Sequence, residues 1–482
     1  MNKNKFYITT TLPYVNATPH IGHALEFIQA DIIARYKRKK LGKENVFFNL
    51  GTDEHGSKIH QKSQEEGIST QEFVDKYSNQ FKDFCKKFDI EYDFFYRTSA
   101  DYHKKHVYKI WNHCLQKGDI YKKKYSAKYC VGCEEFKTEK DLINGKCPIH
   151  QKECITISEE NYFFAISKYK EKMLEYLEKN PNILSPKSKI NELKNFVKDI
   201  QDISISRRKE KMPWGIEVPN DNEQVIYVWF DALTNYIGTI DYASDKNNFE
   251  QWRPGIQIFG PDNLRFQGGI WQGMLAGADL DFSKKLLMHG YILDGKGQKM
   301  SKSLGNVVSP FEQLEKYGSE YIRFYLGAYL NTFGDGNYQE EELKDVINSR
   351  LADNFGNLLS RVVNLANKKG VKINDFEKIE NEFKNKVDNI KKNTLNLMDN
   401  FELSSAFNEV HKLAILGNGY INDIAPWEKN KDQKQIQICL NNLSYLLSIL
   451  IDLYEPVIPK FCYEAKKSLE NIEKIVLFKK LD

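Results

Sequence analysis

Hydrophobic and polar positions follow two alternating patterns through the first 340 residues. Apolar runs rich in aromatic and β-branched residues predict buried strands at 6–10, 46–50, 225–229, 257–259 and 286–289. Apolar residues three and four positions apart predict helices at 21–40, 70–88 and 103–116. This alternation predicts an α/β fold with a Rossmann-like, doubly wound parallel sheet, whose ligands bind beyond the carboxyl ends of the strands. Asp53, Gly260 and His289 would lie at that edge.

The pattern changes twice along the chain. A cysteine-containing segment, 118–222, separates the two groups of strands and predicts a connective domain inserted between residues 1–117 and 223–342. From Leu343 onward the pattern is helical, with breaks expected near Gly370, Gly417 and Pro426. Residues 343–482 are therefore predicted to form a helical bundle.

Four of the eight cysteines lie inside the insertion. Cys130-x2-Cys133, followed after thirteen residues by Cys147-x2-His150, has the spacing of a Cys3His zinc knuckle with tetrahedral ligands. Cys154 is an alternative to His150, and a set of reduced, buried cysteines is the alternative to a metal site. One structural zinc ion per chain is predicted. The other cysteines are expected in apolar cores: Cys85, Cys114, Cys439 and Cys462.

Charge and composition narrow the class of protein. The chain has 70 Lys and Arg against 66 Asp and Glu, a net charge of +4, which excludes a histone-like basic protein. Nucleic acid would therefore bind only at a local surface. No membrane span is expected, because the longest apolar stretch, 443–451, is shorter than the ~20 residues needed. Without a signal peptide or a disulfide framework, the expected location is the cytoplasm.

Two short motifs carry the candidate chemistry. Pro19-His20-Ile21-Gly22-His23 opens a predicted helix, whose unpaired N–H groups attract phosphate, and Gly22 leaves room for a ligand. Lys299-Met300-Ser301-Lys302-Ser303 lies in a glycine-flanked loop, where two lysines can stabilise a leaving pyrophosphate. Alone, the motifs also fit solvated histidines and a basic surface loop. Their occurrence together, in this order, is the specific signal.

With these motifs the sequence resembles the class I aminoacyl-tRNA synthetases, and over its whole length the bacterial methionyl-tRNA synthetases of the one-knuckle zinc type. Further similar stretches are 7–23, Gly51-Thr52-Asp53-Glu54-His55-Gly56, 227–233 and 299–308. The resemblance implies a methionine–tRNA ligase. Such an enzyme converts methionine and ATP, with Mg²⁺, into methionyl-adenylate and pyrophosphate. It then transfers the methionyl group to the 3′-end of tRNA(Met), including initiator tRNA.

The resemblance also assigns residues to the substrates. The ATP-binding set is His20, Gly22, His23, Gly260, Asp262, Lys299, Ser301 and Lys302. In it both histidines contact the triphosphate and both lysines stabilise the transition state. The methionine-binding set is Leu12, Tyr14, Asp53, Trp229, Ala232, Tyr236 and Gln267. Asp53 would pair with the ammonium group, and aromatic edges suit the polarizable sulfur, although Trp229 and Tyr236 also fit an ordinary core.

One stretch departs from the family pattern. Where the family usually has Gly-Lys-Asp-Ile and then Phe-His, this chain has Gly260-Pro261-Asp262-Asn263 and then Phe266-Gln267. Asp262 is retained and would accept bonds from the ribose hydroxyls. Gln267 replaces a histidine of the methionine pocket, which leaves its role open.

The helical domain contains candidate anticodon-reading residues. Asn357 and Arg361 are four residues apart on one helical face, and Trp427 follows Pro426. Amide, guanidinium and indole groups suit an unstacked base, and by resemblance these three read the CAU anticodon. Without the resemblance they would be ordinary helix surface and core. Since the chain ends soon after the bundle, a monomer is expected.

Three alternatives remain. Leucyl, isoleucyl or valyl synthetases carry an editing insertion larger than 118–222, and a cysteinyl synthetase would place its metal ligands in the amino-acid pocket. A catalytically silent tRNA-binding paralogue would not need both histidines, both lysines and Asp53. A small-molecule nucleotidyltransferase shares the sheet and the phosphate motif, but it would not explain the zinc knuckle or the helical domain.

Overall fold

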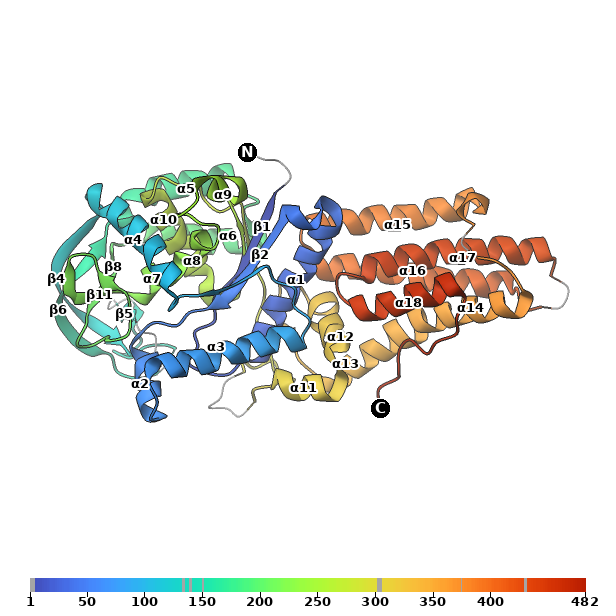
Figure 1. The fold of residues 1–482 in the computed structure, drawn as a ribbon, viewed down its shortest axis with the longest axis horizontal. Coiled ribbons are helices and arrows are strands. Elements are labelled where there is room, and N and C mark those ends of the chain that lie inside the picture. The colour runs from blue at the N-terminus through green and yellow to red at the C-terminus, as the bar shows by residue number, and fades with distance from the viewer. Residues whose placement is uncertain are drawn as a thin grey trace.

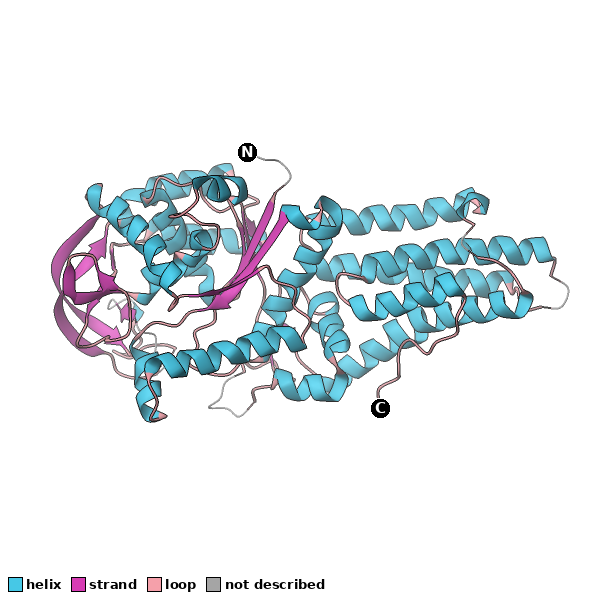
Figure 2. Ribbon diagram, viewed as in Figure 1, coloured by secondary structure: helices cyan, strands magenta, loops and turns pink. Residues whose placement is uncertain are grey.

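The computed structural model describes residues 5–131, 135–137, 141–149, 151–300, 306–373, 375–428 and 431–482. The molecule is elongated (Figure 1), with the sheets at one end and a long helical bundle at the other. Colouring by secondary structure shows the same division, with the bundle end free of strands among the residues described (Figure 2).

A parallel sheet of six strands forms the centre of the catalytic half. Its order is β3 (Phe94–Arg97), β2 (Val46–Thr52), β1 (Phe6–Thr10), β12 (Ile256–Phe259), β13 (Lys285–Met288) and β7 (Leu184–Ser185). β1 and β12 are buried throughout, as expected for parallel strands covered on both faces. The order reverses between these two strands, and such switch points are where doubly wound sheets bind ligands.

Helices and short strands surround this sheet. The helices of the catalytic half are α1 (Ile21–Leu41), α2 (Ser57–Glu65), α3 (Thr70–Lys87), α4 (Asp101–Gln116), α7 (Val228–Leu233), α8 (Asn235–Gly238), α9 (Lys246–Trp252), α10 (Trp271–Gly277), α11 (Pro310–Tyr317) and α12 (Ser319–Arg323). A two-stranded ladder pairs β14 (Ile292–Leu293) with β15 (Gly336–Asn337). The strands expected at 6–10, 46–50, 257–259 and 286–289 and all three expected helices are confirmed.

The strand expected at 225–229 is only partly correct. Residues 221–226 form β11 (Asp221–Ile226), which lies outside the central sheet and pairs with β9 (Ser206–Arg208) and β10 (Glu217–Val218). From Val228 the chain is helical. A short apolar run fits a buried helix as well as a buried strand, so its periodicity could not separate the two.

The inserted segment builds a second, antiparallel sheet. Its order is β5 (Glu135–Lys137), β4 (Ile120–Cys130), β6 (Ile155–Phe164) and β8 (Ile203–Ser204). Helices α5 (Lys170–Lys179) and α6 (Ile190–Lys198) follow, and between them β7 returns to the edge of the central sheet. The exact domain limits stay a prediction.

The C-terminal region is a helical bundle. Its helices are α13 (Glu340–Val346), α14 (Asn357–Lys369), α15 (Asn381–Asp399), α16 (Leu403–Ile424), α17 (Gln433–Tyr454) and α18 (Pro459–Asn471), with a π-helical stretch, 347–356, between the first two. Gly370 ends α14 in a left-handed conformation (φ 62°). The break expected at Gly417 is wrong, because this residue lies inside α16. A Cβ there would come within 2.5 Å of the Leu358 side chain, so the glycine permits close helix packing.

One described helix, α17, has the length and composition that could cross a membrane. Most of it is buried against other parts of the chain, as is typical of a core helix. The main hydrophobic core is continuous from the central sheet into the bundle, for example where Phe6 of β1 stacks on Phe401 before α16.

Candidate active site

A cavity of about 800 Å³ opens at the switch point of the central sheet. It brings together predicted residues from separate segments: Leu12, Tyr14, His20, Gly22, His23, Asp53, Trp229, Gly260, Asp262 and Lys299. The loops after β1, β2 and β12 supply several of them, since the carboxyl ends of parallel strands meet at one edge. Ser301 and Lys302 lie outside the described residues.

The first motif forms the N-terminus of α1. The Nδ1 atom of His20 accepts the N–H of Gly22 at 3.1 Å, and that of His23 accepts the N–H of His20 at 3.2 Å. The two rings stack with centroids 3.6 Å apart. Burial lowers the pKa of His23 well below its ordinary value, and His20 and His289 lower it further. His23 is therefore neutral at pH 7, and the helix end faces the cavity.

The second motif contacts the other side of the cavity through Lys299. Its Nζ lies 2.8 Å from Oδ2 of Asp262 and 4.3 Å from the centre of the Tyr291 ring. The Tyr291 hydroxyl donates to Oδ1 of the same carboxylate at 2.5 Å. Asp262, the residue expected to bind the ribose of ATP, is thus held by the side chains of Lys299 and Tyr291.

The predicted methionine pocket has an inner and an outer layer. Leu12, Tyr14, Asp53 and Trp229 line the cavity, whereas Ala232, Tyr236 and Gln267 do not. The last three are buried behind it. Trp229 stacks on Phe266, the residue before Gln267, with ring centroids 3.9 Å apart.

Gln267 connects the outer layer of the pocket to the loop that follows β1. Its Nε2 donates to the Tyr236 hydroxyl at 2.8 Å and to the Thr11 hydroxyl at 2.9 Å. Its Oε1 is buried and has no hydrogen-bond partner among the described residues. Gln267 therefore supports the pocket wall in this structure rather than lining the cavity.

Behind Asp53 and Trp229 lies a buried polar chain that the sequence did not reveal. Oδ2 of Asp231 is 2.6 Å from Nδ1 of His55, and Oδ1 is 2.5 Å from Nε2 of His103. Nδ1 of His103 is in turn 2.8 Å from the Tyr96 hydroxyl. We call Asp231, His55, His103 and Tyr96 the Asp231 brace. It links the loop that carries Asp53 to helix α7, which carries Trp229.

Asp231 and His55, two groups of the Asp231 brace, shift the pKa values of one another towards their charged forms. Burial alone would raise the pKa of Asp231, but His55 and His103 lower it to about 2. Burial alone would lower the pKa of His55, but Asp231 outweighs it and the pKa is raised. The only sequence signal was that His55 and Asp231 lie within stretches similar to the family.

A further polar pair lines the cavity, in which His289 was expected at this edge of the sheet but Glu26 was not. Glu26 and His289 are joined by an Oε2–Nε2 contact of 3.1 Å, and Oε1 of Glu26 accepts the N–H of Thr11 at 2.7 Å. Glu26 lies one helical turn after Gly22, and His289 directly follows β13, positions that place both at the same strand edge.

Comparison with known proteins agrees with this geometry. Residues 6–155 and 137–363 match the family described as tRNA synthetases class I (M), and residues 380–480 match the anticodon-binding domain of tRNA ligase. The methionine–tRNA ligase of Caldanaerobacter subterraneus subsp. tengcongensis is 39% identical over 98% of this chain and 75% of that protein. The chain belongs to the methionyl-tRNA synthetases.

Other members of the family are similar to the same extent. The Thermotoga maritima methionine–tRNA ligase is 37% identical over 97% of this chain and 77% of its own length. The Mycobacterium tuberculosis methionyl-tRNA synthetase, solved in complex with methionyl-adenylate, superposes with a TM-score of 0.89 at 30% identity, covering 96% of this chain and 93% of that one. The predicted class I fold and anticodon-binding bundle of this synthetase are confirmed.

The predicted zinc knuckle of this family member is only partly described. Cys130, Cys147 and Cys154 pack into a small buried cluster apart from the other cores, whereas Cys133 and His150 lie outside the described residues. No group of three metal-ligating side chains with a suitable arrangement occurs within the described ranges. Burial, together with Cys130 and Cys147, raises the pKa of Cys154. The cluster thus contains the alternative ligand Cys154 and soft donors of the kind that zinc prefers.

Two of the candidate anticodon readers are in contact. The Arg361 guanidinium lies 5.3 Å from the centre of the Trp427 ring, and its Nη2 donates to Oδ1 of Asn422 at 2.6 Å. Trp427 remains 49% exposed, so about half of its surface is accessible. Asn357 is exposed at the start of α14, one turn before Arg361. Asn357 and Arg361 lie on α14 and Trp427 lies between α16 and α17, helices that belong to the bundle away from the central sheet (Figure 1).

Proposed function

We propose that the cavity activates methionine with ATP and that the chain then charges tRNA(Met). The observation that carries this proposal is the meeting of the first motif, Lys299 of the second motif, Asp53 and Trp229 around one cavity at the switch point. In the first step, the methionine carboxylate attacks the α-phosphate of ATP, giving methionyl-adenylate and pyrophosphate. In the second, a hydroxyl group at the 3′-end of tRNA attacks the carbonyl carbon of the adenylate, so that an ester bond to tRNA forms, the acyl–phosphate bond breaks and AMP leaves.

The helix end and Lys299 act on the phosphates in this proposal. The N-terminus of α1 carries partial positive charge, and His20 and His23 add hydrogen-bond donors without the strong hydration of an ammonium group. Because Lys299 is paired with Asp262 in the structure, ATP would displace it as the ribose binds to that carboxylate. The released ammonium group can then follow the charge that develops on pyrophosphate.

Methionine binding follows from the walls of the same cavity. Asp53 would pair with the α-ammonium group, which fixes the carboxylate towards the α-phosphate. Leu12, Tyr14 and Trp229 offer apolar and aromatic surface to the thioether. Ala232, Tyr236 and Gln267 are proposed to support that wall from behind, in keeping with their burial.

Two metal ions belong to the proposal. Mg²⁺ bound with ATP would offset negative charge on the phosphates. A structural zinc ion would be held by Cys130, Cys133 and Cys147, with His150 or Cys154 as the fourth ligand. The thiol cluster fits zinc chemically, and the presence of Cys154 beside Cys130 and Cys147 supports the sulfur alternative. Cytoplasmic location and a monomeric state stay predictions.

Amino-acid-dependent exchange of pyrophosphate into ATP tests the proposed function. Purified protein with Mg²⁺ and ATP is given methionine, leucine, isoleucine, valine or cysteine in turn. Exchange with methionine alone is the expected result. Exchange with cysteine or isoleucine but not methionine would identify another class I synthetase, and tRNA binding without any exchange would identify a silent paralogue.

A further inference from the structure

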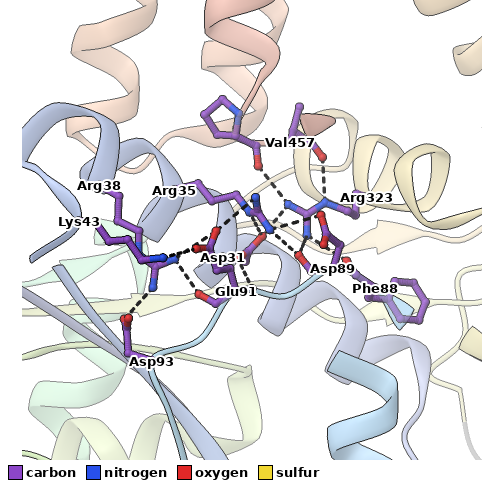
Figure 3. Close-up of polar contacts among 11 residues, drawn as sticks. Asp31, Arg35, Arg38, Lys43, Phe88, Asp89, Glu91, Asp93, Arg323 and Val457 are labelled. Carbon is purple, nitrogen blue, oxygen red and sulfur yellow. Dashed lines mark hydrogen bonds and ion pairs between the residues drawn. The ribbon is translucent and has the colours of Figure 1, made fainter. Parts of the chain in front are cut away.

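A buried guanidinium joins the catalytic half of the chain to the bundle (Figure 3). Arg323, the last residue of α12, has no exposed side-chain surface, and each of its five N–H donors has an acceptor. The acceptors are a carboxylate oxygen of Asp31 and the backbone carbonyls of Phe88, Asp89, Pro456 and Val457, at distances of 2.6 to 3.3 Å.

These acceptors come from three parts of the fold. Asp31 lies on α1, residues 88 and 89 form the turn after α3, and residues 456 and 457 form the turn between α17 and α18. Asp31 is itself fully buried, and it also accepts Nε of Arg35 at 2.8 Å and the N–H of Glu91 at 2.8 Å. We call Arg323, Asp31 and Arg35 the Arg323 hub.

The hub differs from the other contacts between the two halves. The rest of the described interface combines a continuous apolar core with exposed ion pairs, such as Lys39–Asp452 and Lys40–Asp399. It also contains polar contacts that engage one or two donors each, such as Tyr36 and Lys37 with Asp399 and the Phe461 N–H with Glu320. Apolar contacts tolerate small rotations, and exposed ion pairs contribute little to stability. A guanidinium with five directed hydrogen bonds is satisfied in a single relative orientation, because any shift leaves buried donors without acceptors.

Rigid helices connect the hub to both functional regions. Asp31 lies ten residues after Ile21, about 15 Å along α1 from the helix end that faces the cavity. Helix α17 begins six residues after Trp427, and its 22 residues span about 33 Å before the turn that contacts Arg323. The hub therefore lies between the helix that carries His20 and the helix that starts near the anticodon readers.

We propose that Arg323 is a positioning residue for tRNA charging. By fixing the bundle against α1, it lets a tRNA that is held by its anticodon present its 3′-end to the cavity. Formation of methionyl-adenylate needs no tRNA and is independent of this orientation. The proposal rests on the proposed function, because it concerns the second of the two steps.

The test compares Arg323→Lys with Arg38→Lys. Lysine keeps the charge but lacks the planar array of donors, so most of the five bonds are lost. Arg38 is a matched control: it is a second largely buried arginine, it lies on α1, and among the described residues it bonds only to Glu91 and Asp93 of the catalytic half. Each variant is measured for methionine-dependent pyrophosphate exchange, for charging of full tRNA(Met), and for charging of a hairpin that contains only the acceptor stem.

Arg323→Lys is expected to lower kcat/KM for full tRNA(Met) roughly tenfold to a hundredfold, the cost of a small misplacement of reacting groups. Exchange and hairpin charging should stay within about twofold of the unmodified protein, as should all three activities of Arg38→Lys. Asp31→Asn keeps the backbone carbonyl partners of Arg323 and should also lower the ratio of full-tRNA charging to hairpin charging. It replaces Arg323→Lys in the test if that variant does not fold.

An unchanged ratio of full-tRNA to hairpin charging in a folded Arg323→Lys or Asp31→Asn variant would overturn the proposal. Equal losses in exchange and in charging would also overturn it, because they would indicate general damage. Failure of the proposed function can be distinguished from failure of this positioning proposal, because the unmodified protein would then show no methionine-dependent exchange.

Discussion

Replacing Asp231 with asparagine tests whether the buried brace holds the methionine pocket together. Asparagine has nearly the same shape but no charge, so it cannot accept charge-assisted bonds from both His55 and His103. The fall of the Asp231 pKa from 3.8 to about 2 corresponds to about 2 kcal/mol of stability, at ~1.4 kcal/mol for each pKa unit. Because the side chain is fully buried, this figure needs no reduction for exposure to solvent.

The pH dependence of the effect follows from the two pKa directions. The Asp231 contribution is present above its ordinary pKa of 3.8 and is lost as the pH falls towards 2. The His55 contribution is fully present below its ordinary pKa of 6.5 and is lost as the pH rises through its raised pKa. Asp231→Asn should therefore destabilise the protein most between pH ~4 and ~6.5.

Urea denaturation at several pH values and exchange kinetics measure both consequences. We expect a loss of about 2 kcal/mol in unfolding free energy near pH 6, and a KM for methionine that rises roughly tenfold while the KM for ATP changes little. His106→Gln is a suitable control, because His106 is buried on the same helix as His103 but, among the described residues, accepts only the N–H of Ala243. A loss of stability that is the same at every pH, or an unchanged KM for methionine, would refute the reasoning.

Four further substitutions test other parts of the account. Lys299→Ala should slow methionine-dependent exchange by about 10²–10³ with unchanged tRNA affinity, as for loss of one transition-state donor, and unaltered exchange would remove its assigned role. Trp427→Ala should lower aminoacylation roughly tenfold while exchange is kept, because stacking on a base contributes ~1–3 kcal/mol, and equal losses in both reactions would argue against anticodon reading. Metal analysis should find about one zinc ion per chain. Cys154→Ser should lower this zinc content if sulfur is the fourth ligand, and full zinc content in this variant would favour His150. Gly51→Ala should lower the Tm by several degrees, because a Cβ there would lie 1.9 Å from the Tyr96 carbonyl oxygen, and a variant as stable as the parent would contradict this packing.

Local patterns were sufficient for most of the fold. The buried runs that became β1, β2, β12 and β13 contain the residues typical of parallel strands, and the spacing of apolar residues located α1, α3 and α4. Errors occurred where a pattern was compatible with two structures. The run from Tyr227 to Leu233 is apolar at almost every position, and Gly417 disrupts a helical pattern in the sequence although it packs against Leu358 in the structure.

The candidate site shows the same limit. Residues inside short motifs, such as His20, His23 and Lys299, could be predicted because their spacing has a chemical meaning, and the structure places all three around one cavity. The Asp231 brace and the contact of Glu26 with His289 were missed because their members lie far apart in the sequence and meet only after folding, although His289 itself was expected at this strand edge. The Arg323 hub was missed for the same reason, since four of its five acceptors are backbone carbonyls, which leave no trace in the residue types.

A structure of the protein crystallised with methionine and ATP would test the central claim most directly. The account predicts methionyl-adenylate in the cavity, with its phosphate at the N-terminus of α1, its ammonium group at Asp53, and Lys299 displaced from Asp262. An occupied cavity in which the amino acid lies away from Asp53 and Trp229, or in which the Lys299–Asp262 pair stays intact beside a bound nucleotide, would contradict it.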